Sequence, residues 1–172
     1  MGSLLFPNEL FAFNDIENFP YDSDVRSLKF FNVNSLEHLN ITYYENGDYI
    51  SEAHTKINDF MADKRSGQTT IMDLALIDTL HKIHALSDSK QSLEIICGYR
   101  SPNTNETLRH TKRGIAQHSY HTLGQAADIS IKDFPLHKLR DIAISLNVGG
   151  VGFYPNSGFV HVDVGPVRRW IG

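Results

Sequence analysis

Three side chains of types that bind zinc occur in the second half of the chain. His121 and Asp128 lie on one short segment, and His161 lies on a later one. A catalytic zinc site uses three protein ligands and leaves a fourth position for a water, whose pKa the metal lowers to about 7. The set therefore predicts a hydrolytic metal centre. Taken alone the pattern is weak, since nine histidines and twenty acidic residues supply some such triple by chance.

A strand expected at residues 159–164 places two ionisable side chains on one face. Its other face is apolar and carries Val160, Val162 and Val164. Along the strand, His161 and Asp163 stand about 6 to 7 Å apart. The carboxylate of Asp163 is therefore the first candidate for a general acid/base, and His118 on the preceding loop is a weaker one. The alternative role for Asp163 is to hold His161 in its metal-binding tautomer.

Two further polar side chains stand next to expected rigid elements. A turn at residues 98–102 follows a buried strand at 93–97 and lifts Arg100 off its end, which is a good place for a functional cation. A fixed planar guanidinium can stabilise an oxyanion, whereas the alternative for Arg100 is a surface salt bridge. Ser119 precedes His121 by two positions and either bonds substrate backbone or closes the local turn.

Cys97 is the single cysteine of the chain. It cannot form an internal disulfide, and it ends the apolar run Leu93-Glu94-Ile95-Ile96-Cys97, which is typical of a buried strand. We expect inert packing for its thiol, with cysteine-based catalysis as the minor alternative.

Length and composition favour one ordinary globular domain. The chain has 172 residues, of which 41% are hydrophobic and 21% charged. A formal charge of −4, with Lys and Arg scattered along the chain, makes nucleic-acid binding unlikely. The sequence has no apolar run long enough for a transmembrane helix and no export-signal pattern at its start. Met1-Gly2-Ser3 is consistent with a cloning start that replaced such a signal.

The order of periodic segments predicts how these residues are positioned. Residues 1–25 show no period and are expected to form an arm on a domain at 26–172. We expect strands at 28–33, 39–44, 93–97, 126–131, 151–154 and 159–164, with a hairpin turn at Asn46-Gly47. We expect four helices. The first is capped by Ser51 and ended by Gly67, and the second follows the apolar stripe of Met72, Leu76, Leu80 and Ile83. The third runs from Asn103 to Arg109 and the fourth covers 136–146.

The residues around His121 also carry a family resemblance. The segment Ser119-Tyr120-His121-Thr122-Leu123-Gly124-Gln125-Ala126-Ala127-Asp128 resembles the Ser-x-His-x-x-Gly-x-Ala-x-Asp signature of the zinc D-Ala-D-Ala carboxypeptidase and hedgehog-like metallopeptidase superfamily. Within it, the chain is similar to the YcbK-like murein endopeptidases through Gly98 to Asn105, Gly149 to Pro155, and Phe159 to Asp163 followed by Gly165-Pro166-Val167-Arg168. The similarity covers roughly residues 26–172.

This resemblance implies a fold, a cofactor and a substrate. The fold would be α+β, a mainly antiparallel sheet with flanking helices and a zinc cleft on the sheet face. His121, Asp128 and His161 match the zinc ligands, and Arg100 matches the arginine that contacts substrate near the scissile amide. Tyr99 and Ser119, in the same motifs, would bind substrate. The substrates would be peptidoglycan peptides, hydrolysed in the periplasm or cell envelope.

One position departs from the wider superfamily and keeps other functions open. Many carboxypeptidase-type relatives place a catalytic acid three residues before the last histidine ligand, where this chain has Gly158. This departure favours a non-catalytic zinc-containing binding module as the alternative function. A separate alternative is a metal-free structural domain whose histidines bind no metal. The bond that a peptidase would cut also stays open between the D-Ala to diaminopimelate link, the direct diaminopimelate to diaminopimelate link, and a terminal D-Ala.

Overall fold

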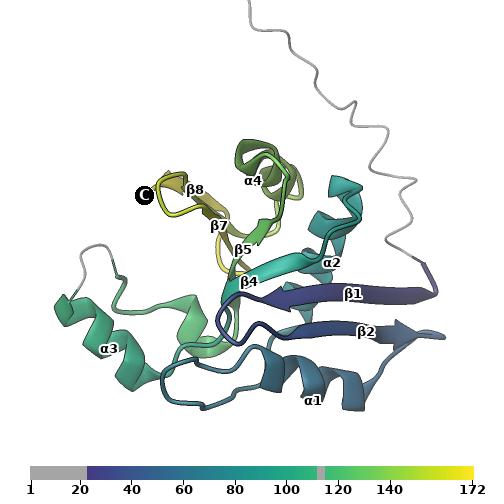
Figure 1. Ribbon diagram of the computed structural model, residues 1–172, viewed down its shortest axis with the longest axis horizontal. Coiled ribbons are helices and arrows are strands. Elements are labelled where there is room, and N and C mark those ends of the chain that lie inside the picture. Colours follow the sequence, from purple (N-terminus) through teal and green to yellow (C-terminus); the bar gives the residue numbers. More distant parts are fainter. Residues whose placement is uncertain (1–22, 112–114) are drawn as a thin grey trace, which may run out of the picture.

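A single sheet of eight strands organises residues 23–111 and 115–172, which are the residues that the computed structural model describes (Figure 1). The strands are β1 (Val25–Asn32), β2 (His38–Glu45), β3 (Asp48–Tyr49), β4 (Leu93–Cys97), β5 (Ala126–Ile131), β6 (Gly150–Tyr154), β7 (Phe159–Asp163) and β8 (Arg168–Ile171). The helices are α1 (Ser51–Phe60), α2 (Leu74–Ser87), α3 (Pro102–Thr111), α4 (Leu136–Ser145) and the short 3₁₀ helix η3 (Tyr120–Leu123). Most of the arm expected at residues 1–25 lies outside the described residues.

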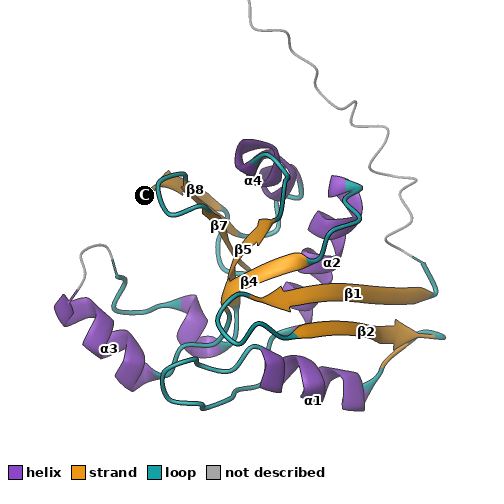
Figure 2. Ribbon diagram, in the orientation of Figure 1, coloured by secondary structure: helices purple, strands orange, loops and turns teal. Residues whose placement is uncertain are grey.

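The sheet has the order β3-β2-β1-β4-β5-β7-β6-β8. Its neighbouring strands are antiparallel except for β1 with β4 and β6 with β8, which run parallel. Figure 2 shows the strands twisting through the molecule with helices beside them. The expected α+β fold with a mainly antiparallel sheet is thereby confirmed.

One hydrophobic core joins the sheet to three of the helices. Helices α1, α2 and α4 bury apolar side chains in a single cluster with the strands, among them Ile57, Leu76, Leu80, Leu139, Ile95, Ile129 and Val160. Helix α3 lies away from α2 and α4, at the left of the view (Figure 1). Because side chains alternate along a strand, residues next to the core positions of β4, β5 and β7 face the other way. No helix in the described ranges is long and apolar enough to cross a membrane.

The first helix is shorter than the sequence predicts. Ser51 lies inside α1, which follows Ile50 without a side-chain cap, and the helix ends at Phe60 rather than near Gly67. The backbone is diverted beyond it because Asp63 accepts hydrogen bonds from the Arg65 N–H and the Ser66 hydroxyl. These local bonds compete with helix continuation, as Asp side chains commonly do. Gly67, with φ of 69°, closes this turn instead of the helix.

A helix boundary and the number of strands also differ from expectation. Helix α3 starts at Pro102, and the hydroxyl of Ser101 accepts from the Thr104 N–H at 3.2 Å, so the cap is Ser101 rather than Asn103. An eighth strand, β8, extends the sheet beyond β6, which the sequence did not predict. Strand β8 is short and mostly exposed, so it lacks the buried apolar alternation that marks a strand in a sequence.

Candidate metal centre and substrate cleft

A cross-strand row on the face opposite the core positions two of the expected metal ligands. Asp128 on β5 lies directly opposite His161 on β7 in the antiparallel register. The preceding row, buried in the core, is Ile95, Ile129 and Val160. Residues directly opposite each other on one face have Cβ atoms about 4.5 to 5.5 Å apart, so their polar ends can meet. The Nδ1 atom of His161 lies 2.9 Å from Oδ1 of Asp128.

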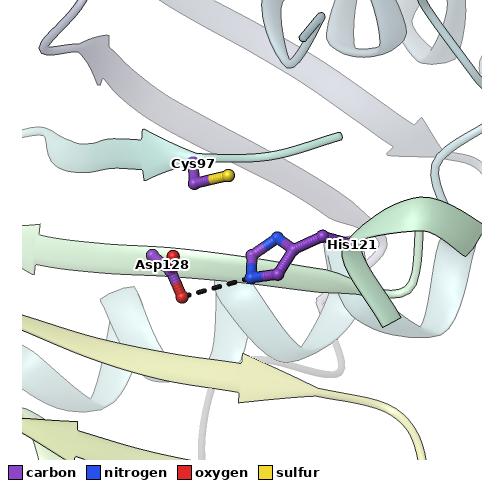
Figure 3. Close-up of side chains that lie close together, drawn as sticks. All are labelled: Cys97, His121 and Asp128. Atoms are coloured by element: carbon purple, nitrogen blue, oxygen red, sulfur yellow. Dashed lines mark ion pairs between the residues drawn. The ribbon is translucent and has the colours of Figure 1, made fainter. Parts of the chain in front are cut away.

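His121 reaches the same point from η3, directly before strand β5. The short helix ends at Gly124 in the left-handed region, with φ of 69°, and the chain then enters β5. His121 is 3% exposed, and its Nδ1 lies 2.7 Å from the carbonyl oxygen of Gly98. Because a carbonyl only accepts, Nδ1 carries a proton, and Nε2 is the nitrogen that can bind a metal once it has lost its own proton. That Nε2 points at Asp128, as Figure 3 shows, with 3.3 Å to Oδ1.

The three donor atoms have the spacing that a zinc ion requires. His121 Nε2 and His161 Nδ1 are 3.2 Å apart, and each lies within 3.3 Å of Oδ1 of Asp128. Ligand atoms bound tetrahedrally at 2.0 to 2.1 Å from zinc are about 3.4 Å from one another. Two imidazoles and one carboxylate are also a usual donor set for a catalytic zinc. The residues therefore fit the metal that the family resemblance implies.

The opposite edge of the His161 ring is held by Asp163. His161 Nε2 lies 3.0 Å from Oδ2 of Asp163, so the ring donates there and leaves Nδ1 for a metal. Asp163 is 1% exposed, and its oxygens also accept from the Gly150 and Gly165 N–H groups. The guanidinium of Arg168 adds two bonds, at 2.9 and 2.7 Å. The carboxylate of Asp163 is thus surrounded by donors, with the imidazole between it and Asp128.

Burial and charge act against each other in the pKa values of the site. Burial raises the pKa of Asp163, but the bonds from His161, Arg168 and Gly165 outweigh it and bring the pKa below its ordinary value. The pKa of Asp128 is also lowered: burial raises it, but the larger effect of His121 and His161 brings it below its ordinary value. Burial lowers the pKa of His121, yet the Asp128 carboxylate raises it well above the ordinary value. Both carboxylates are therefore ionised at neutral pH, as metal ligation and ligand orientation require.

A cleft of about 660 Å³ opens over these ligands. Its wall includes Arg100, His118 and Ser119 together with the three ligands. The Arg100 N–H donates to the carbonyl oxygen of His121 at 3.1 Å, and its Nη1 contacts Oδ1 of Asn105 at 3.4 Å. Arg100 makes no salt bridge within the described part of the chain, in contrast to the alternative considered from the sequence.

Ser119 and Tyr99 occupy different surroundings. Ser119 is 8% exposed and lines the cleft, where its carbonyl oxygen accepts from the N–H and the hydroxyl of Thr122. Tyr99 packs against the core cluster, and its N–H donates to the carbonyl oxygen of Met61 at 2.8 Å. Tyr99 lines a separate small hollow next to Met61 rather than the cleft. The structure thus brings Ser119, but not Tyr99, beside the expected metal ligands.

An aromatic wall beside the metal ligands has no counterpart in the sequence-based expectations. Trp170 on β8 lies with its ring centroid 5.3 Å from that of His161, and its Nε1 donates to the Tyr154 hydroxyl at 2.8 Å. Tyr154 in turn stacks on Phe159 at 4.5 Å between centroids. All three line the cleft. In the sequence, this wall could have been inferred from Trp170, the single tryptophan of the chain, which follows the Gly165-Pro166-Val167-Arg168 motif by two residues.

Cys97 does not pack in the core as the sequence suggested. It is half-buried, and its Sγ atom lies within 4.8 Å of a ligand atom of both His121 and Asp128. Figure 3 shows the three side chains converging from β4, η3 and β5. The Nη2 atom of Arg100 is 3.6 Å from the same sulfur.

Comparison with known proteins identifies similar chains. A family model described as peptidoglycan L,D-endopeptidase MepK matches residues 21–170. The peptidoglycan L,D-endopeptidase MepK of Escherichia coli (strain K12) is 39% identical over 145 residues, which cover 84% of this chain and 80% of the relative. The probable peptidoglycan L,D-endopeptidase MepK of Haemophilus influenzae is 41% identical over 148 residues, which cover 86% and 80%. No solved structure matches the chain with significant similarity.

Proposed function

Since the chain belongs to the peptidoglycan L,D-endopeptidase MepK family, we propose that it is a zinc-dependent peptidase that hydrolyses peptidoglycan cross-link peptides. The observation that carries this proposal is the convergence of three donor atoms, from His121, Asp128 and His161, within 3.3 Å of one another. This convergence lies at a cleft that can admit a peptide.

The family name supports one bond over the others. Relatives in this family are named L,D-endopeptidases. Of the two cross-links considered from the sequence, the direct diaminopimelate to diaminopimelate link joins an L-centre carbonyl to an amine on a D-centre. We infer that this link is the substrate, and that the protein works where peptidoglycan is found, in the periplasm or cell envelope.

Different residues of the chain have different roles in the proposed amide hydrolysis. When bound, zinc supplies a Lewis acid and an acidified water. We assign to Arg100, which lines the cleft, the stabilisation of the negative charge that develops on the oxygen of the scissile carbonyl. Gly98 fixes the tautomer of His121 through its carbonyl oxygen, and Asp163 fixes the tautomer of His161. The aromatic wall around Trp170 limits access of solvent from one side of the cleft.

The contacts of Asp163 favour the positioning role over the acid/base role. Its carboxylate bonds to Nε2 of His161, on the side of the ring away from Nδ1 and Asp128. Its pKa is also below the ordinary value, which makes it a weak proton acceptor. His118 lines the cleft with an exposed imidazole, so we assign it the transfer of a proton from the attacking water to the leaving amine.

Digestion of isolated peptidoglycan, followed by mass analysis of the muropeptides, tests this function. Zinc-loaded protein should convert directly linked diaminopimelate dimers to monomers, and chelator should stop the reaction. A His161→Ala protein, matched for concentration, controls for contaminating hydrolases. If zinc-loaded protein binds peptidoglycan and leaves every cross-link intact, the non-catalytic module becomes the correct function. The glycine at position 158, which lies in the turn before β7, is the feature that favours that outcome.

A further inference from the structure

Strand β4 adds a third residue to the row that holds Asp128 and His161. Cys97 lies directly opposite Asp128, so the row runs Cys97, Asp128, His161 across β4, β5 and β7. The pairing of β4 with β5 is irregular between Ile95 and Cys97. Ile95 is opposite Ile129 and Cys97 is opposite Asp128, which leaves Ile96 as the extra residue. Such bulges re-aim a side chain next to active sites.

The irregularity decides which face Cys97 occupies. In regular alternation Cys97 would share the core face with Ile95, because the two are separated by one residue. With Ile96 as the extra residue, Cys97 comes opposite Asp128, on the same side of the sheet as the metal ligands. The Cys97 sulfur therefore lies beside the candidate metal ligands, where it can donate to a cation, and does not pack in the hydrophobic core.

Two overlapping donor sets result from this arrangement. Asp128 is central in the row, and His121 lies beside it from η3. His161 completes one set on the β7 side, and Cys97 completes a second on the β4 side, with all three donor atoms of the second set within 4.8 Å. The second set combines a sulfur, an imidazole and a carboxylate. Thiolate ligands favour soft cations as well as zinc, imidazoles suit zinc, and carboxylates suit harder cations. Exchange of an imidazole for a thiolate therefore shifts the preference of the set toward softer cations.

We propose that Cys97 makes this centre a binding site for sulfur-preferring divalent cations such as Cd²⁺, held by Cys97, His121 and Asp128. The inference rests on the proposed metal centre, with which it shares two ligands. On binding, the Cys97 thiol loses its proton to solvent and the sulfur forms a bond to the cation. The cation competes with zinc for His121 and Asp128, so it inactivates the peptidase.

The contact between Cys97 and Arg100 gives this binding a second effect. Nη2 of Arg100 donates toward the sulfur at 3.6 Å. A cation bound to that sulfur repels the positively charged guanidinium. It also occupies the sulfur lone pair toward which Arg100 donates. Arg100 is thereby turned away from its place at the cleft. Loss of the oxyanion-stabilising group and loss of zinc both follow from one binding event.

Ultraviolet absorption of the chelator-treated protein during titration with Cd²⁺ tests the proposal without measuring activity. Cys97 is the single cysteine of the chain, so any sulfur-to-cadmium charge-transfer band reports on this residue alone. We expect the band to saturate at one Cd²⁺ per chain in the wild type and to be absent from Cys97→Ser. That variant should bind Cd²⁺ at least about 10-fold more weakly, since even outer contacts of a metal site contribute that much.

A second variant distinguishes a shared centre from an isolated thiol. His121→Ala keeps the cysteine but removes a ligand common to both sets, so its band should appear only at Cd²⁺ concentrations about 10-fold higher or more. Equal Cd²⁺ affinity of wild type and Cys97→Ser would overturn the proposal, as would an unchanged band in His121→Ala. Zinc binding measured on the same samples separates this proposal from the proposed zinc centre. If zinc binds but no cadmium–sulfur band appears, only the role of Cys97 is rejected. If zinc does not bind, the metal centre itself is rejected.

Discussion

Asp128 on β5 and His161 on β7 are cross-strand partners whose Oδ1 and Nδ1 atoms lie 2.9 Å apart. Their meeting depends on the register of the two strands, because a slip by one residue sends a side chain to the other face of a sheet. The valines of β7 bury on the core face and so fix that register. The packing of Val160 and Val162 therefore keeps His161 opposite Asp128.

Removal of a ligand should abolish stoichiometric zinc. We expect His121→Ala and His161→Ala to retain less than about a tenth of the wild-type zinc after dialysis, since a three-ligand site loses most of its affinity with one donor. Elemental analysis of the purified proteins measures this. His137→Ala, at an exposed position on α4, is the matched control and should keep its zinc. One zinc per chain in either ligand variant would show the assignment to be wrong.

The substitution Asp163→Asn distinguishes a positioning role from an acid/base role. If Asp163 orients His161, the amide should weaken zinc binding by about 10- to 100-fold, and added zinc should restore much of the rate. If Asp163 is the proton acceptor, zinc should stay bound while turnover falls by about 10²- to 10⁴-fold. Its contacts predict the first result. Zinc affinity and turnover at saturating zinc, measured on one preparation, give the answer.

Arg100 should affect the chemical step and not the metal. Arg100→Gln removes the planar cation from the cleft, and we expect kcat to fall by about 10²- to 10³-fold, as for loss of one oxyanion donor. Zinc content should equal that of the wild type, because the side chain of Arg100 is not among the ligands. Muropeptide kinetics and elemental analysis together measure both quantities. A rise in KM with normal kcat would instead assign Arg100 to ground-state binding of substrate.

Zinc affinity should depend on pH through His121. In the metal-free protein Asp128 raises the pKa of His121, so the imidazolium persists above the ordinary range and zinc must displace a proton. This ion pair stabilises the metal-free fold below the ordinary histidine pKa of about 6.5, and the contribution is lost as pH rises through the raised value. Zinc affinity should thus increase with pH over that interval. Isothermal titration at several pH values measures it, and a flat profile would exclude His121 as the group displaced.

Gly98 allows the end of β4 to approach the end of α1. A Cβ atom built at this position would lie 2.7 Å from Cβ and 2.8 Å from the carbonyl oxygen of Met61. Gly98→Ala should destabilise the fold by about 1 to 3 kcal/mol, the usual cost of overpacking. It should also weaken zinc binding, since the Gly98 carbonyl orients His121. Thermal unfolding and zinc titration measure the two effects, with exposed Lys138→Ala as the control.

Local patterns in the sequence predict much of the fold because they are caused by local physics. The alternating valines of β7 and the apolar stripe of α2 report directly on which side is buried. Strand β7 occurs where expected, whereas α2 begins at Leu74, after Met72, because Asp73 caps it by accepting from the Ala75 N–H. Boundaries depend on hydrogen bonds between segments that a pattern does not contain. The carboxylate of Asp63 illustrates this, since it ends the run after α1 and also accepts from the Ser101 N–H at 2.9 Å.

The three candidate ligands were expected from their residue types together with the family resemblance, because the residue types alone gave only a weak pattern. His121, Asp128 and His161 were expected together and lie together. The position of Cys97 was not predictable, because it depends on one irregular pairing in β4 that no residue type encodes. The surroundings of Asp163 were equally hidden, since Arg168 arrives from a strand without an apolar signature.

Strand β8 pairs in parallel with β6 and brings Arg168 to Asp163. Parallel neighbours cannot be joined by a tight hairpin, so this pairing depends on the longer connection that runs through β7. Until it forms, the carboxylate that orients His161 lacks its guanidinium partner, and the aromatic wall lacks Trp170. A complete cleft therefore requires β8 to be docked against β6, because this last strand supplies both side chains.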